Sequence, residues 1–160
     1  MAINEGDSLP SVTLTEMIDG APTPTPLDDL TKGKKVVFFA VPGAFTPTCS
    51  AKHLPGFVEQ AGSIKGKGVD EIICLSVNDV FVMDAWGKAQ NAGGKVRMLA
   101  DGNGDLASAM GLTMDGSKFG MGQRSQRYAM IVADGKVEKL LVEQGPGLDL
   151  SSAESVLGNL

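Results

Sequence analysis

The sequence predicts an α/β fold in which helices flank a mixed β-sheet. Two continuous runs of β-branched and aromatic residues, Lys35–Val41 and Glu71–Val77, are typical of strands buried on both faces. A helical segment follows each run, and a hairpin and a last helix come later in the chain. This order favours helices packed around one sheet. With 160 residues the chain is long enough for a sizeable core, so we expect residues 1–160 to form a single domain.

The N-terminal half contains the first elements and the main helix. Residues 12–15 alternate and predict a short strand that could lie at a sheet edge, whereas the proline-rich stretch 22–26 predicts an extended loop. After the first buried strand, Thr46 is a natural N-cap and Pro47 suits the first helical position. We therefore expect a helix from about Pro47, with a kink or break at Pro55-Gly56.

The remaining elements follow from apolar runs separated by turn residues. They are a helix near Phe81–Trp86, a strand Val96–Ala100, a short helix Asp105–Met110 closed by Gly111, a glycine-rich loop Asp115–Gln123, a hairpin of Arg127–Val132 and Lys136–Val142 across Ala133-Asp134-Gly135, and a last helix capped by Ser151 or Ser152 with Glu154 in its first turn. In such sheets the active site lies beyond the carboxyl ends of the strands, where Cys49 falls.

Composition and charge limit the kinds of partner. The formal net charge is −5 with no basic run, which argues against nucleic acid and anionic membrane as partners. Residues 1–7 lack the features of a signal peptide, and two cysteines without such a signal are best interpreted as reduced thiols in the cytoplasm. No calcium or zinc ligand spacing is present, so we expect no metal ion.

Cys49 is the residue most suited to chemistry. It lies three residues past the predicted cap, where backbone N–H groups and the positive end of the helix dipole favour the thiolate over the thiol. The alternative is a buried and inert cysteine. The spacing Thr46-x-x-Cys49 is that of a Cys-x-x-Cys turn without its first cysteine, which disfavours a thioredoxin-type reductase.

The pattern Pro42-x-x-x-Thr46-x-x-Cys49 is similar to the signature of peroxiredoxins. Residues 41–57 resemble the atypical type II, peroxiredoxin 5-like subgroup. Further matches are Ser76-Val77-Asn78-Asp79, Ala85-Trp86-Gly87, Leu99-Ala100-Asp101-Gly102 and Arg127-Tyr128-Ala129, with Val80 as a small departure where many members carry proline. The matches span nearly the whole chain in the expected order.

The resemblance implies a thioredoxin-like fold and a thiol-dependent peroxidase that reduces hydrogen peroxide and alkyl hydroperoxides without a cofactor. Cys49 would attack the peroxide and become a sulfenic acid. Thr46 would hydrogen-bond the thiolate and the peroxide, and Pro42 would shield the sulfur from water. Arg127, rather than its neighbour Arg124, would lie beside the thiolate and stabilise charge on the breaking O–O bond. The family also implies a homodimer.

The resemblance leaves the regeneration of Cys49 open. Cys74 is similar in position to the resolving cysteine of plant-like type II members, but its apolar neighbours also fit a purely structural thiol in a core strand. A disulfide needs Cα atoms within about 7 Å, so resolution by Cys74 would require the first turn of the Cys49 helix to unwind. Otherwise an external reductant, glutathione with glutaredoxin or thioredoxin, must attack the sulfenic acid.

Other residues offer alternative interpretations. His53, four residues after Cys49, could be the base of a thiol hydrolase or transferase, or simply a histidine on the helix surface or at an interface. A redox sensor whose interface changes on oxidation of Cys49 is a third possibility. Phe45 and Phe81 could line the site entrance, form a subunit contact or pack in the core, and Trp86 is most simply a core residue.

Overall fold

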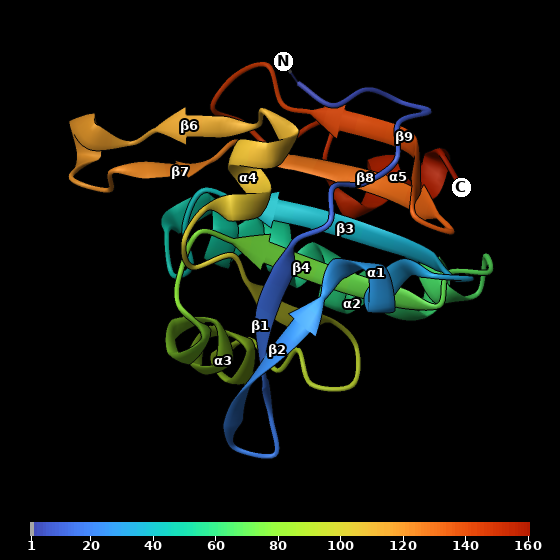
Figure 1. Ribbon diagram of the computed structural model, residues 1–160, viewed down its shortest axis with the longest axis horizontal. Coiled ribbons are helices and arrows are strands. Elements are labelled where there is room, and N and C mark those ends of the chain that lie inside the picture. Colours follow the sequence, from blue (N-terminus) through green and yellow to red (C-terminus); the bar gives the residue numbers. More distant parts are fainter. Residues whose placement is uncertain (1) are drawn as a thin grey trace.

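The computed structural model describes residues 2–160 and is built on a seven-stranded mixed sheet (Figure 1). Its strand order is β2-β1-β5-β4-β3-β8-β9. The strands are β1 (Thr13–Ile18), β2 (Ala21–Pro26), β3 (Lys35–Val41), β4 (Glu71–Ser76), β5 (Arg97–Ala100), β8 (Tyr128–Ala133) and β9 (Lys136–Val142). The predicted α/β class and the central position of the two apolar runs, now β3 and β4, are confirmed.

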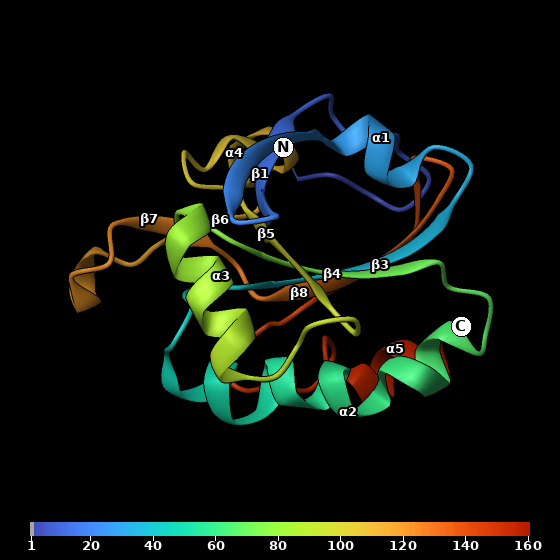
Figure 2. The same ribbon diagram turned by 90° about the horizontal axis from the view of Figure 1, so that it is seen from below.

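Helices cover both faces of this sheet (Figure 2). One face carries α2 (Leu54–Lys65), α3 (Val80–Ala89) and α5 (Ala153–Gly158), and the other carries α1 (Leu27–Thr31) and α4 (Asp105–Met110). Side chains of β3 alternate between two cores because strand residues point to opposite faces. Phe39 packs in the core that contains Cys49, whereas Phe38 packs in the opposite core.

The direction of the strands creates one edge at which loops converge. β3, β4 and β5 are parallel, and both β1 and β8 run antiparallel to their neighbours. Val41 pairs with Ser76, which in turn pairs with Ala100, so the carboxyl ends of all three parallel strands lie together. The antiparallel β8 begins at the same edge, since Tyr128 pairs with Ala40.

Two expectations for the N-terminal segment are wrong. The proline-rich stretch is not a loop but the edge strand β2, whose Pro22, Pro24 and Pro26 pair with every second residue of β1. Prolines at a period of two lie on the same side of the strand, and an edge strand tolerates them because one side needs no N–H donor. β1 is therefore an inner strand, paired with both β2 and β5. Helix α1 was not predicted.

The predicted glycine-rich loop, Asp115–Gln123, connects two short strands that were not predicted. These strands, β6 (Thr113–Asp115) and β7 (Gln123–Ser125), form a small separate hairpin with the short 3-10 helix η2 (Ser117–Phe119) at its tip. The hairpin extends away from the main sheet (Figure 1). By contrast, the predicted β8–β9 hairpin, the closure of α4 by Gly111 and the cap of α5 by Ser152 are confirmed.

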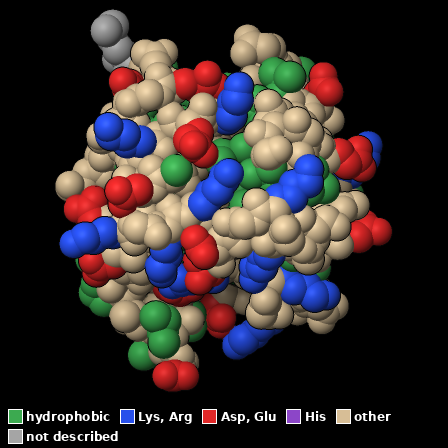
Figure 3. Space-filling view, turned by 90° about the vertical axis from the view of Figure 1, so that its right-hand side faces the viewer, with side chains coloured by type: hydrophobic (Ala, Val, Ile, Leu, Met, Phe, Trp, Pro, Cys, Tyr) green, Lys and Arg blue, Asp and Glu red, His purple; other side chains and the backbone are tan. Residues whose placement is uncertain are grey.

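The surface shows acidic and basic side chains side by side. On the face drawn in Figure 3, Lys and Arg are interspersed with Asp and Glu, and the described residues of that face form no continuous basic patch. Within residues 2–160, no helix combines the length and the apolar character needed to cross a bilayer.

Candidate active site

The loop after β3 carries Cys49 into the first helical turn. Helical backbone begins at Pro47, as predicted, and the Cys49 side chain is fully buried. Thr46 does not cap this helix with its side chain, because its hydroxyl donates to the carbonyl of Gly43 at 2.6 Å. The Thr46 carbonyl accepts the N–H of Ser50 at 2.9 Å and so begins the helical hydrogen bonds. The predicted cap is therefore wrong for the side chain, while the predicted helix start is confirmed.

The helix continues through Pro55 without the expected break. Its first part is a π-helical turn, η1 (Cys49–His53), in which the N–H of Leu54 donates to the carbonyl of Cys49, and α2 follows directly. Pro55 has no N–H, and in a regular α-helix its ring would collide with the carbonyl four residues earlier. The wider turn before it removes that conflict. The proline thus shapes the turn that carries Cys49 rather than ending the helix.

Arg127 lies directly against the sulfur of Cys49. Its Nη2 donates to Cys49 Sγ at 3.0 Å, and its backbone carbonyl accepts the N–H of Glu143 at 3.0 Å. It immediately precedes β8 at the convergent edge of the sheet. Arg124, the alternative considered from sequence, instead donates to the carbonyls of Met121 and Val77. The structure therefore brings Arg127, and not Arg124, to Cys49.

His53 is buried and holds Arg127. Its Nδ1 accepts a hydrogen bond from Arg127 Nη1 at 2.8 Å, and its Nε2 lies 2.9 Å from the carbonyl oxygen of Ser151. Because guanidinium only donates, Nδ1 must be the acceptor and Nε2 carries the proton. Burial, and then the positive charge of Arg127, lower the pKa of His53 from 6.5 to about 3. Both sequence interpretations, a surface histidine and a base for Cys49, are wrong for this buried, neutral ring.

Glu143 and Ser151 complete the support behind His53. The Glu143 carboxylate accepts from the backbone N–H of Ser151 at 2.7 Å, from its hydroxyl at 2.6 Å and from the N–H of Asp149 at 2.9 Å. Burial opposes ionisation, but these hydrogen bonds outweigh it and lower the pKa of Glu143. Sequence reasoning missed both residues, since no motif links them to a cysteine about a hundred positions away.

Cys74 lies in the middle of the sheet. It belongs to β4, pairs with Phe39 on one side and Met98 on the other, and is fully buried. Burial above all, together with the nearby Cys49, raises the pKa of the Cys74 thiol well above its ordinary value. Both cysteines are free. Cys74 is therefore a protonated thiol held in a central strand.

An open cavity of about 520 Å³ leads to the group around Cys49. Pro42, Thr46 and Arg127 line one part of it. The lining also includes the apolar side chains of Met114, Phe119, Met121 and Pro146. The three signature side chains therefore meet at a surface opening, and the Cys49 sulfur beside Arg127 is buried.

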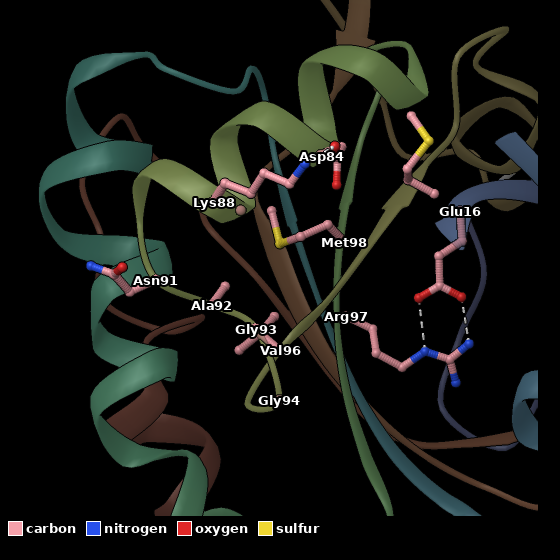
Figure 4. Close-up of a pocket in the computed structure, with 12 residues that line it drawn as sticks. Glu16, Asp84, Lys88, Asn91, Ala92, Gly93, Gly94, Val96, Arg97 and Met98 are labelled. Atoms are coloured by element: carbon pink, nitrogen blue, oxygen red, sulfur yellow. Dashed lines mark hydrogen bonds and ion pairs between the residues drawn. The ribbon is translucent and has the colours of Figure 1, made fainter. Parts of the chain in front are cut away.

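A second, larger cavity of about 640 Å³ lies between α3 and β5 and has no comparable chemistry (Figure 4). The charges at its rim are already paired. Arg97 forms two hydrogen bonds with Glu16, at 3.0 and 2.6 Å, and Lys88 pairs with Asp84 at 3.0 Å. Neither cysteine lines this cavity, so the site around Cys49 remains the candidate active site.

The aromatic residues near the site divide between core and surface. Trp86 is fully buried, as predicted, and its Nε1 donates to the hydroxyl of Ser50 at 3.0 Å. Phe45 and Phe81 are 55% and 64% exposed, which rules out their assignment to the core. Phe45 also has a left-handed backbone, with φ of 65°, and its ring lies 6.4 Å from that of Trp86.

Comparison with known proteins agrees with this geometry. The profile of the Redoxin family matches residues 4–157. Peroxiredoxin-2E-2, chloroplastic, of Oryza sativa subsp. japonica is 50% identical over 95% of this chain and 70% of its own. Peroxiredoxin-2B of Arabidopsis thaliana is 47% identical over 95% and 94%, respectively. The chain belongs to the type II peroxiredoxins.

Solved peroxiredoxin structures share the fold closely. Reduced Prx3 of Vibrio vulnificus in complex with hydrogen peroxide is 50% identical, covers 98% of both chains and superposes with a TM-score of 0.95. Peroxiredoxin 5 of Alvinella pompejana is 35% identical over 97% of this chain and 96% of its own, with a TM-score of 0.85. The thioredoxin-like redoxin fold is thereby confirmed, and as a peroxiredoxin the protein is a thiol-dependent peroxidase.

Proposed function

We propose that Cys49 is the nucleophile of this peroxidase and that hydrogen peroxide and alkyl hydroperoxides are its substrates. The observation that carries the proposal is the hydrogen bond of 3.0 Å from Arg127 Nη2 to the buried Cys49 Sγ. A guanidinium is permanently charged and stabilises negative charge on the sulfur. The cavity lined by Pro42, Thr46 and Arg127 gives a small peroxide access to that sulfur.

The proposed step is a two-electron transfer. The Cys49 thiolate attacks one peroxide oxygen, an S–O bond forms and the O–O bond breaks. The leaving oxygen takes a proton and departs as water or an alcohol, and Cys49 is left as sulfenic acid. As the O–O bond breaks, negative charge moves from the sulfur to the leaving oxygen. The Arg127 guanidinium stabilises that charge on both atoms.

Thr46 and Pro42 orient the peroxide and limit access of water. The Thr46 hydroxyl donates its proton to Gly43, so its oxygen is left as an acceptor for the O–H of a peroxide. Pro42, half-buried at the cavity wall, contributes no N–H that would hold water there. These roles follow the positions that the two residues share with the family signature.

For regeneration we propose an external thiol rather than Cys74. Cys74 lies in the middle of the sheet, with its thiol protonated by burial, and the thiolate is the attacking species in thiol exchange. An external thiolate would attack the sulfur of the Cys49 sulfenic acid and form a mixed disulfide, and the displaced hydroxide would take a proton and leave as water. A second thiol would then reduce that disulfide. Glutathione with glutaredoxin, or thioredoxin, would supply these two electrons, in a reducing compartment such as the cytoplasm that suits two free cysteines.

We also propose a homodimer of single-domain subunits. Phe45 and Phe81 are more than half exposed, and Phe45 lies beside the helix that carries Phe81. Exposed aromatic side chains of this kind are typical of a protein interface. Sedimentation analysis of wild-type protein and Phe81→Asp tests this: a dimer that dissociates in the variant is expected, and a monomeric wild type would contradict it.

The assignment of Cys49 is tested by steady-state consumption of hydrogen peroxide with a thiol reductant. Cys49→Ser should show no turnover above background, because serine cannot form a sulfenic acid. Cys74→Ser is the matched control, since it changes the same atom in the other buried cysteine and should retain turnover. Turnover of Cys49→Ser at the wild-type rate would contradict the proposal.

A further inference from the structure

The hairpin of β6 and β7 is a wall of the active-site cavity that needs support. Each strand has only three residues, and the hairpin pairs with no strand of the main sheet within residues 2–160. A two-stranded ribbon of this size is not stable alone in water. At its base, the N–H of Gln126 donates to the carbonyl of Leu112 at 2.8 Å. The position of its tip over the cavity must depend on contacts farther out.

Arg124 makes such a contact. Its Nε donates to the carbonyl of Met121 at 2.8 Å, and its Nη1 donates to the carbonyl of Val77 at 3.0 Å. Met121 belongs to the hairpin, whereas Val77 follows β4 at the convergent edge of the sheet. The guanidinium therefore ties the outer part of the hairpin to the body of the protein. A planar fork with fixed donors is suited to such a bridge.

The hairpin contacts the loop that carries Pro42 and Thr46, and the contact is at Gly43. A Cβ atom at Gly43 would lie 2.9 Å from Met121 Cε and 3.0 Å from Thr46 Cγ2, which leaves no room for a side chain. The same position is 3.5 Å from Arg124 Nη1. Met121 thus packs directly on the loop that carries Pro42 and Thr46, and all three residues line the cavity.

We propose that Arg124 is a positioning residue that fixes Met121 and its own cross-strand partner Met114 as an apolar wall and thereby sets the preference for alkyl hydroperoxides over hydrogen peroxide. This inference rests on the proposed function of the same cavity. Hydrogen peroxide has no apolar group to place on that wall. The alkyl part of a larger hydroperoxide gains contacts there, and such contacts change kcat/KM by about 10-fold or more per group.

The test compares cumene hydroperoxide with hydrogen peroxide. Reduced protein is mixed with each peroxide in a single turnover, and the second-order rate constant for loss of the Cys49 thiol is measured. Arg124→Met and Met121→Ala should lower the constant for cumene hydroperoxide by about 10-fold and that for hydrogen peroxide by less than about 3-fold. Arg124→Lys, which keeps the charge but loses the fork, should show the same direction.

Arg97→Met is the matched control, because Arg97 is also a half-buried paired arginine but lies at the distant cavity. It should leave the ratio of the two rate constants unchanged. Equal losses for both peroxides, or an unchanged ratio in all three hairpin variants, would overturn the inference while leaving the proposed function intact. A wild-type protein whose Cys49 does not react with hydrogen peroxide would instead overturn the proposed function.

Discussion

At the scale of single residues, the Cys49 sulfur is the end of a chain of hydrogen-bonded groups. Glu143 holds Ser151, the Ser151 carbonyl accepts the proton of His53 Nε2, and His53 Nδ1 accepts from Arg127. Each link fixes the donor or acceptor direction of the next. Because the His53 ring is neutral, it does not reduce the positive charge of Arg127. The other terminal nitrogen of that guanidinium, Nη2, contacts Cys49 Sγ. We infer that His53 acts through Arg127 and not on the peroxide.

Replacement of His53 should separate this positioning role from simple packing. His53→Leu removes the acceptor for Arg127 Nη1, and a displaced fork should lower the rate of Cys49 oxidation by about 100-fold. His53→Gln keeps an acceptor oxygen on a side chain of similar length, and its rate should stay within about 10-fold of wild type. Single-turnover oxidation by hydrogen peroxide measures both. Equal rates for the two variants would contradict the role of the acceptor.

The pKa of His53 predicts how stability depends on pH. This pKa is lowered from 6.5 to about 3 in the folded protein, so between these values the unfolded chain binds a proton that the folded protein does not. The contribution is fully present above pH 6.5, and the free energy of unfolding should fall by up to about 1.4 kcal/mol per pH unit below it. Urea unfolding at pH 7, 6 and 5 measures this slope.

The His53→Gln variant is the control for that slope, because glutamine does not titrate. Its stability should depend less on pH over the same range, since only the carboxylates then contribute. The same slope in wild type and variant would show that His53 is not buried in its neutral form.

The sequence could predict some of these residues and not others. Pro42, Thr46, Cys49 and Arg127 stand in a recognisable signature, so their meeting was predictable before any geometry. The role of His53 was not, because its spacing from Cys49 is equally typical of a surface residue and of a base. Its actual partners are 74 and 98 positions away, and only the folded chain places them around the ring.

At the scale of secondary-structure elements, sequence patterns predicted an element correctly where a single conformational preference dominates. β3 and β4 follow from uninterrupted apolar runs, and α4 ends at Gly111 as expected. The expectations based on proline were wrong in two places. A neighbouring strand made the proline-rich stretch an edge strand, and a π-turn let the main helix pass through Pro55. Both outcomes depend on hydrogen bonds that proline does not need to make.

Two glycine-to-alanine changes test the local conformation of these elements, and we expect opposite effects on the free energy of unfolding. Gly135 has a φ of +79° in the β8–β9 turn, which alanine adopts only with strain, so Gly135→Ala should lower the free energy of unfolding by about 1 kcal/mol. Gly62 is exposed within α2, with no atom within 4 Å of an added Cβ. Gly62→Ala should therefore raise the free energy of unfolding by about 0.5–1 kcal/mol.

Chemical denaturation measures both changes, and neither variant should alter the rate of Cys49 oxidation. The same sign for the two variants would contradict the assignment of Gly135 to a left-handed turn or of Gly62 to a regular helix.

At the scale of the whole molecule, the sheet brings the site together. The loop after β3, the loop after β4 and the start of β8 converge at one edge. Asn78, after β4, accepts the N–H of Ala44 at 3.0 Å and thus fixes the loop that leads to Cys49. The same sheet holds Cys74 rigidly in its centre. We propose that this architecture lets peroxide reach the buried Cys49 through the cavity beside Arg127 and withholds Cys74 from it.

This contrast is the central claim, and mass spectrometry of the oxidised protein tests it most directly. Reduced protein receives one equivalent of hydrogen peroxide in the presence of a sulfenic-acid trapping reagent, without any other thiol. We predict that the trap labels Cys49 alone and that Cys74 remains a free thiol. An intramolecular Cys49–Cys74 disulfide, or a label on Cys74, would contradict this account.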